Sequence, residues 1–138
     1  MLTARDIMTE NVVTIPPTCS VGHAIELLIQ EQISGLPVVD EHDQLVGIVT
    51  EFALLATAYD ESIASETVDK HMTIDVLTVD IDDPVRKVAD LFIVHRVRRV
   101  PVMENGRIAG LVSRRDVLKA VYEGSAHLNG ANSVTFGR

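Results

Sequence analysis

Ser113 and Asp116 stand three residues apart in an arginine-rich stretch, and this stretch of the chain is the best suited to bind a small molecule. A carboxylate accepts two hydrogen bonds from neighbouring hydroxyl groups, and such charge-assisted bonds are stronger than neutral ones. At the start of a helix, unpaired backbone N–H groups and the helix dipole favour an anion. The guanidinium groups that could bind the anion belong to Arg98, Arg99, Arg114 and Arg115. The stretch is therefore chemically suited to hold a diol with an attached anion.

The same spacing also has a purely structural interpretation. Ser-x-x-Asp at a helix start is a capping motif, which stabilises the helix with or without a ligand. Arginines on a surface are often no more than solvated side chains. Both interpretations stay open for the sequence alone, and one residue can serve both purposes.

The elements around this motif follow from turn and helix signals. Asn105-Gly106 is a strong hairpin signal, so strands are expected over residues 100–103 and 107–113. A helix capped by Asp83, with Pro84 at its first position, should precede the hairpin, and a closing helix should begin at Ser113. The apolar stripe expected on the earlier helix is Val85, Val88, Ala89, Phe92 and Ile93.

The order of these elements repeats an earlier half of the chain. Met8-Thr9 returns as Met72-Thr73, at an offset of 72 − 8 = 64 residues. The matched apolar runs are 36–39 with 100–103 and, after one residue is lost from the turn, 47–50 with 110–113. Two long matched copies are typical of one supersecondary unit used twice around a shared core. We expect an α/β (α+β) fold of two pseudo-symmetric units, each a small three-stranded sheet packed against two helices.

The domain boundaries follow from the repeat. The first copy with its polar connector is expected over residues 1–65, the second over residues 66–123, and a C-terminal tail over residues 124–138. In the first copy, Thr3 should open a short helical turn with a capping box, and Ser20 should cap a longer helix. The two copies should meet about a pseudo-twofold axis, which would create two related clefts.

Charge is distributed unevenly between the copies. Residues 1–65 contain one basic and ten acidic side chains, 1 − 10 = −9, whereas residues 66–138 contain eleven and ten, 11 − 10 = +1. Arginines clustered within a chain of net charge −8 favour a local anion site over a nucleic-acid surface. The chain has neither a run of apolar residues long enough to span a membrane nor a signal-peptide pattern, so we expect a cytoplasmic protein with no membrane partner.

Catalytic and metal motifs are missing from the sequence. Cys19 is the only cysteine, and the five histidines do not have a metal-ligand spacing. The chain also lacks a Gly-x-x-x-x-Gly-Lys loop and a Gly-x-Ser-x-Gly elbow. We therefore expect no enzyme, no catalytic residue, no metal and no required cofactor.

The repeated motifs resemble those of the cystathionine-β-synthase (CBS) domain, over about residues 3 to 122. The motifs that carry the resemblance are Asp6-Ile7-Met8-Thr9, Gly35-Leu36-Pro37-Val38-Val39-Asp40, Gly47-Ile48-Val49-Thr50, Asp69-Lys70-His71-Met72-Thr73, Arg99-Val100-Pro101-Val102 and Gly110-Leu111-Val112-Ser113-Arg114-Arg115-Asp116. The resemblance implies a tandem pair, or Bateman module, that binds adenosine compounds between its copies and regulates an associated enzyme or transporter. It also implies a stand-alone module that forms a homodimer.

The resemblance assigns roles to individual residues. Ser113 and Asp116 match the family's contacts to ribose and phosphate, and Pro101 would shape the pocket wall. The base would lie between apolar side chains, for which the candidates are Ile74, Val76 and Val100. The first copy departs from this pattern, because Ala53 replaces the ribose-binding carboxylate and Glu51 would repel phosphate. Its weaker or empty second site would consist of Ser34, Gly35, Pro37 and Thr50.

These observations lead to a hypothesis with three alternatives. The chain is expected to be a regulatory module that binds AMP, with ADP or ATP as competitors, and modulates a partner protein. One alternative is a structural module for dimerisation or docking without a nucleotide. A sensor of S-adenosylmethionine is the second, although the arginines disfavour a cationic ligand. A nucleic-acid regulator is the third, and the net charge counts against it.

Overall fold

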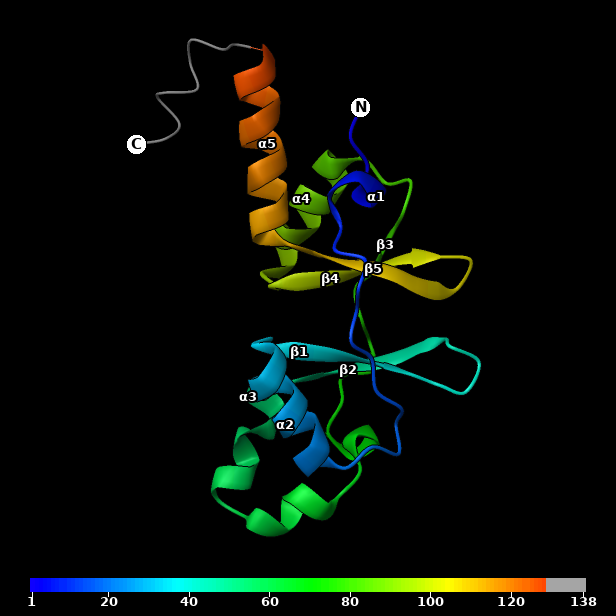
Figure 1. The fold of residues 1–138 in the computed structure, drawn as a ribbon, viewed down its shortest axis with the longest axis vertical. Coiled ribbons are helices and arrows are strands. Elements are labelled where there is room, and N and C mark those ends of the chain that lie inside the picture. The colour runs from blue at the N-terminus through cyan, green and yellow to red at the C-terminus, as the bar shows by residue number, and fades with distance from the viewer. Residues whose placement is uncertain (129–138) are drawn as a thin grey trace. The chain divides into compact units, whose positions relative to one another are not determined.

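The computed structural model describes residues 1–128, which form two compact units (Figure 1). We call one the second-copy unit, because it holds Thr78–Glu104 and residues 109 onward, together with Met1–Val12. The other is the first-copy unit, which holds Val13–Leu77 and Asn105–Ile108. Helices and small sheets alternate in both, so the predicted α+β class is confirmed.

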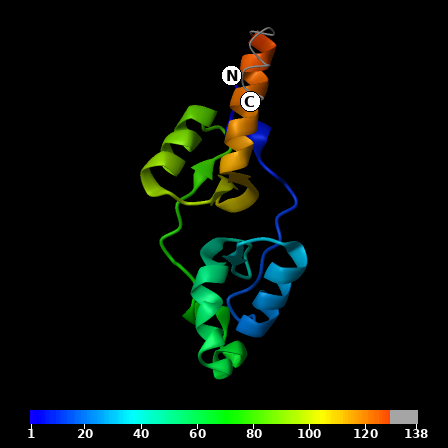
Figure 2. The same ribbon diagram turned by 90° about the vertical axis from the view of Figure 1, so that its left-hand side faces the viewer.

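The second-copy unit contains a three-stranded sheet of order β3-β4-β5, with α4 and α5 packed beside each other (Figure 2). Strand β3 runs parallel to β4, with Val79 opposite Val102. Asn105 and Gly106 join β4 to β5 with φ angles of 53° and 80°, as a type I′ turn requires. Its elements are α1 (Ala4–Ile7), β3 (Val79–Asp80), α4 (Val85–His95), β4 (Arg99–Glu104), β5 (Arg107–Ser113) and α5 (Arg114–Leu128).

The core of this unit is mainly aliphatic, with one aromatic residue, Phe92, and is built where α4 meets the sheet. Val88 and Phe92 of α4 are buried together with strand residues Val100, Val102 and Val112. Ile93 was expected on the same stripe but is 75% exposed, so that prediction is wrong. The buried stripe follows the spacing of four from Val88 to Phe92, and the next residue along the helix turns about 100° away from it.

The first-copy unit contains an antiparallel pair, β1 and β2, in which Gly35 lies opposite Thr50. The expected third strand is reduced to one parallel bridge between Ile15 and Val38. Pro16 and Pro17 follow Ile15 and have no N–H to donate, so the ladder ends there. The elements are α2 (Val21–Glu31), β1 (Gly35–Val39), β2 (Leu45–Thr50), α3 (Glu51–Leu54) and the 3₁₀ helices η1 (Leu55–Ala58), η2 (Glu61–Ser65) and η3 (Val68–Lys70).

Each unit is completed by the segment that opens the other sequence copy. In the second-copy unit, Ala4 is fully buried, and Thr9 exchanges backbone hydrogen bonds of 2.8 and 3.0 Å with Leu111. In the first-copy unit, Val68 is fully buried, and Thr73 exchanges bonds of 2.8 and 2.9 Å with Ile48. The boundary between residues 65 and 66 therefore describes the sequence repeat, whereas the compact units exchange their opening segments.

The predicted helix ends are partly correct. Ser20 caps α2, since its Oγ accepts the N–H of His23 at 3.1 Å, and the capping box from Thr3 to Asp6 is present. Asp83 does not cap α4, because Pro84 occupies the N-cap position and the Asp83 carboxylate accepts the N–H of Asp80 at 2.8 Å. Helix α5 continues to Leu128, into the segment expected as a tail, and residues 129–138 lie outside the described part.

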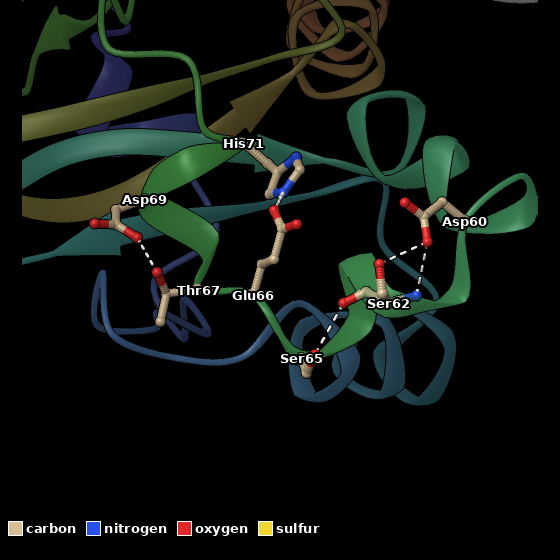
Figure 3. A network of polar contacts seen from close by, with 7 residues as sticks. All are labelled: Asp60, Ser62, Ser65, Glu66, Thr67, Asp69 and His71. Atoms are coloured by element: carbon tan, nitrogen blue, oxygen red, sulfur yellow. Dashed lines mark hydrogen bonds and ion pairs between the residues drawn. The ribbon is translucent and has the colours of Figure 1, made fainter.

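The polar connector after α3 forms short helical turns fixed by local hydrogen bonds (Figure 3). The Asp60 carboxylate accepts the N–H of Ser62 at 3.0 Å and its hydroxyl at 2.6 Å. His71 Nε2 lies 2.8 Å from Glu66 Oε1, and Thr67 donates to Asp69. The hydrogen bonds from Ser62 lower the pKa of Asp60 from its ordinary value.

Candidate functional site

The candidate site is the corner where β5 ends and α5 begins, and two reciprocal hydrogen bonds form it. The N–H of Ser113 donates to Asp116 Oδ2 at 2.8 Å, and the N–H of Asp116 donates to Ser113 Oγ at 3.2 Å. Both residues are half-buried. This is the capping arrangement allowed by the sequence, and it fixes the carboxylate in one orientation. An ionised carboxylate has about four acceptor positions, so capping does not exhaust its capacity.

Arg114 has a structural role in this corner. Its Nε donates to the Val97 carbonyl at 2.9 Å, and its Nη2 donates to the Arg96 carbonyl at 2.8 Å. Arg96 ends α4 with a left-handed φ of 53°, where helix carbonyls lack partners of their own. Arg114 thus ties the end of α4 to the start of α5, and only part of its guanidinium remains for an anion. Sequence spacing gave no signal of this contact, which joins residues 17 and 18 positions apart.

The remaining arginines of the candidate set differ in exposure. Arg98 and Arg115 are exposed, whereas Arg99 is half-buried. Within the part of the chain that the structure describes, Arg98 and Arg115 make no hydrogen bond or ion pair. Their guanidinium groups are therefore free to donate hydrogen bonds to an anion.

The apolar candidates lie in two different environments. Val100 and Pro101 are fully buried, and Val100 belongs to the core of the second-copy unit. The side chain of Val100 packs inside this core, and its predicted role beside a base stays a prediction. Ile74 is 71% exposed and Val76 is half-buried, and both belong to the first-copy unit. Their convergence with Asp116 stays a prediction.

The equivalent corner of the first-copy unit contains only half of this arrangement. Thr50 Oγ1 accepts the N–H of Ala53 at 3.2 Å, but Ala53 has no carboxylate that could accept the N–H of Thr50 in return. The N–H of Glu51 donates to the Ser34 carbonyl at 2.9 Å. Gly35 is half-buried and Pro37 is buried. This corner is capped, yet it lacks both the acceptor for a diol and a cation at the position of Arg114.

A close contact that sequence analysis missed braces each sheet near its corner. A Cβ built on Gly110 would lie 2.6 Å from Met8 Sδ and 2.8 Å from the Thr9 carbonyl oxygen. One built on Gly47 would lie 2.6 Å from Met72 Sδ and 2.9 Å from the Thr73 carbonyl oxygen. In each unit, the Met-Thr motif therefore packs directly against the Gly motif. The signal was the recurrence of both motifs, at offsets of 72 − 8 = 64 and 110 − 47 = 63 residues.

Over residues 1–128, no three His, Cys, Asp or Glu side chains are grouped so that they could hold a metal ion. None of the helices found there is long and apolar enough to cross a membrane.

Similar solved structures share this fold over nearly their whole length. CBSX2 of Arabidopsis thaliana, solved in complex with AMP, is 31% identical with a TM-score of 0.81, over 89% of this chain and 98% of that one. The CBS domain pair of protein MJ0100, in complex with 5-methylthioadenosine and S-adenosyl-L-methionine, is 29% identical with a TM-score of 0.77, over 91% of this chain and 98% of that one.

Among curated proteins, a 17.7 kDa protein of Acidianus ambivalens is 30% identical over 118 residues, which are 85% of this chain and 71% of that protein. Inosine-5′-monophosphate dehydrogenase of Methanocaldococcus jannaschii is 34% identical over 117 residues, but these are only 23% of the enzyme. The chain spans between 22% and 41% of the length of this enzyme and two other relatives from that organism.

The family model for the CBS domain matches the chain twice, over residues 4–59 and 66–123. The two matches coincide with the two halves of the sequence repeat, and the repeated Met-Thr, Pro and Gly motifs fall inside them. On this evidence the chain belongs to the CBS domain family, as a tandem pair of such domains.

Proposed function

We propose that the chain is a regulatory module that binds an adenosine compound through its second-copy corner. The observation that carries the proposal is the pre-oriented Asp116 carboxylate, held by the Ser113 N–H at 2.8 Å. The solved relatives with AMP and with S-adenosyl-L-methionine and 5-methylthioadenosine support an adenosine-containing ligand.

Different residues of the site would bind the sugar and the anion of the ligand. Asp116 accepts hydrogen bonds from the two ribose hydroxyls, and Ser113 lies at the start of α5, where the helix dipole favours phosphate. Arg98 and Arg115, whose side chains are exposed, supply the positive charge, together with the half-buried Arg99. Pro101, which is buried in β4, supports the wall of the site.

AMP is the ligand that this chemistry favours, with ADP and ATP as competitors. The arginine side chains match a phosphate, whereas S-adenosyl-L-methionine brings a positive sulfonium centre to the same place. Bound nucleotide alters a partner only if it prefers one arrangement of the module, and its binding energy then shifts that equilibrium. We propose that the partner is an enzyme or a transporter, since the chain resembles segments of longer enzymes.

Thermal unfolding with AMP, ADP, ATP and S-adenosyl-L-methionine in parallel tests the proposal. A ligand at 100 times its dissociation constant stabilises the folded state by about 2.7 kcal/mol. AMP should give the largest shift of the midpoint, and Asp116→Asn should remove most of it. No shift with any of the four compounds would favour a purely structural module instead.

Asp116→Asn is chosen because it separates binding from folding. The amide oxygen of asparagine still accepts the Ser113 N–H, so the cap persists without the charge. Thr50→Val is the matched control in the first-copy corner, and it should leave the AMP-induced shift unchanged.

We also propose that the chain forms a homodimer. Large apolar side chains are exposed on the helices of both units, including Phe52 at 81% and Leu118 at 69%. A contiguous exposed apolar patch marks a site of association, and these side chains would contribute to one in the proposed dimer.

A further inference from the structure

Two half-buried methionines anchor the opening segments that complete the two units. Met8 packs against the core of the second-copy unit, and Met72 packs against the core of the first-copy unit. The sulfur of each lies so close to a strand glycine that a Cβ added to Gly110 or Gly47 would come within 2.6 Å of it. Little room therefore remains between each sulfur and its glycine.

A carbonyl oxygen lines the same narrow space in each unit. The Thr9 oxygen would lie 2.8 Å from the added Cβ, and it already accepts the N–H of Leu111 at 3.0 Å. The Thr73 oxygen has the equivalent place, 2.9 Å from the added Cβ, and accepts the N–H of Ile48 at 2.9 Å. A thioether suits these surroundings because it is apolar and only a weak acceptor. A sulfoxide does not, because its oxygen is an additional polar group with a volume of its own.

Methionine thioethers react with hydroperoxides, and a half-buried side chain stays within reach of so small a reagent. The sulfur lone pair attacks one peroxide oxygen, an S–O bond forms as the O–O bond breaks, and the peroxide proton passes to the departing oxygen. Sulfur is oxidised by two electrons, and the hydroperoxide is reduced to an alcohol, or hydrogen peroxide to water. Met1 can react in the same way, but it is fully exposed, so its sulfoxide disturbs no packing.

We propose that Met8 and Met72 are oxidation sites for a hydroperoxide, and that a sulfoxide at either one loosens the opening segment it anchors. Gly110 precedes Ser113 by three residues on β5, so oxidation of Met8 also removes support beside the candidate corner. Met72 packs on β2 of the first-copy unit, so its oxidation leaves that corner unaffected. The link to the corner rests on the proposed function, whereas the loosening of the segments does not.

Amide hydrogen exchange in the full chain tests the two sites separately. The N–H groups of Thr9 and Thr73 each donate to the neighbouring strand at 2.8 Å, so their exchange reports whether the two segments stay attached. Hydrogen peroxide should speed exchange at both by roughly tenfold or more in the wild type. Methionine sulfoxide reductases should restore the original rates. Met8→Leu should protect Thr9 alone, and Met72→Leu should protect Thr73 alone.

Peptide mass spectrometry after the same treatment measures oxidation at each methionine. If Met8 and Met72 stayed reduced at a dose that fully oxidises Met1, neither would be a modification site. If their sulfoxides formed without faster exchange at Thr9 and Thr73, oxidation would not loosen the segments. Met8→Gln places a polar group at the first site without an oxidant, and it should speed exchange at Thr9 alone. Unchanged exchange in that variant would also contradict the inference.

The AMP-induced thermal shift is a separate measurement. Peroxide should remove most of the shift in the wild type and in Met72→Leu, but not in Met8→Leu. A shift that survives peroxide in the wild type would show that the corner does not depend on the Met8 contact. If AMP gave no shift before treatment, the proposed function would fail, while the exchange rates would still decide whether the methionines are oxidation sites.

Discussion

The corner between β5 and α5 and the corner between β2 and α3 share one local structure, a strand followed by a capped helix. Both place a hydroxyl at the helix start, Ser113 in one and Thr50 in the other, and in both it accepts the N–H three residues on. Only the second-copy corner adds a carboxylate, Asp116, that accepts the hydroxyl residue's own N–H. The cap alone therefore suffices for the fold, so specialisation for a ligand would reside in the extra carboxylate and its arginines.

The contrast extends to the residue that follows each hydroxyl. Arg114 ties the start of α5 to the carbonyls of Arg96 and Val97, whereas the side chain of Glu51 has no donor for such a bond. Where the two units agree, as in the Met–Gly contact, a mutation should have equal effects in both. Where they differ, its effects should be unequal.

The largest effects should come from the contact that the units share. Gly110→Val and Gly47→Val each place a side chain against a methionine sulfur and a backbone carbonyl oxygen. Overpacking of this kind typically costs about 1–3 kcal/mol, so both variants should lose stability by similar amounts in urea denaturation. Gly124→Ala is the control, since nothing lies within 4 Å of its Cβ. A loss in only one unit would contradict the equivalence of the two contacts.

Removal of the Asp116 carboxylate should cause the next largest loss of stability. The first-copy corner has no equivalent carboxylate to lose. Asp116→Ala removes the acceptor of the Ser113 N–H and should cost about 0.5–2 kcal/mol of unfolding free energy, as other cap deletions do. The reciprocal change, Ala53→Asp, should complete a capping box at Thr50 and raise stability in the same assay. If Ala53→Asp destabilised the protein, the two corners would not share one geometry.

Substitution of Arg114 should lower the free energy of unfolding by less, and substitution of Glu51 should leave it almost unchanged. Arg114→Ala removes two hydrogen bonds to backbone carbonyls in an exposed setting, so a loss of about 1 kcal/mol is expected. Glu51→Ala is the matched control and should stay near zero. Equal losses for the two variants in chemical denaturation would show that the contact with Arg96 and Val97 does not stabilise the corner.

The smallest effect concerns pH and the Thr3 capping box. Hydrogen bonds from the Thr3 N–H and then its hydroxyl lower the pKa of Asp6 below its ordinary value of 3.8. A depressed pKa stabilises the fold above that value, and the contribution disappears as pH falls through the folded-state pKa. The difference in melting temperature between wild type and Asp6→Ala should therefore be present at pH 6 and shrink below about pH 3.8. Lys70→Ala, at the matching position of the second copy, should give a pH-independent difference over this range.

The sequence predicted most of the local structure, because local signals determine it. The Asn105-Gly106 turn, the Ser20 cap and the Thr3 box each depend on residues within a few positions of one another, and each is confirmed. The exchange of opening segments between the units was not predicted, since contacts such as Thr9 with Leu111 join distant residues. For the same reason the bond from Arg114 to Val97 was missed, and the burial of Val100 in the core was not predicted.

Isothermal titration of AMP into wild type, Asp116→Asn and Thr50→Val tests the central claim most directly. The wild type and Thr50→Val should each bind one AMP per chain, and Asp116→Asn should lose binding while its melting temperature is preserved. Two equivalent sites per chain, or a site abolished by Thr50→Val but not by Asp116→Asn, would contradict it.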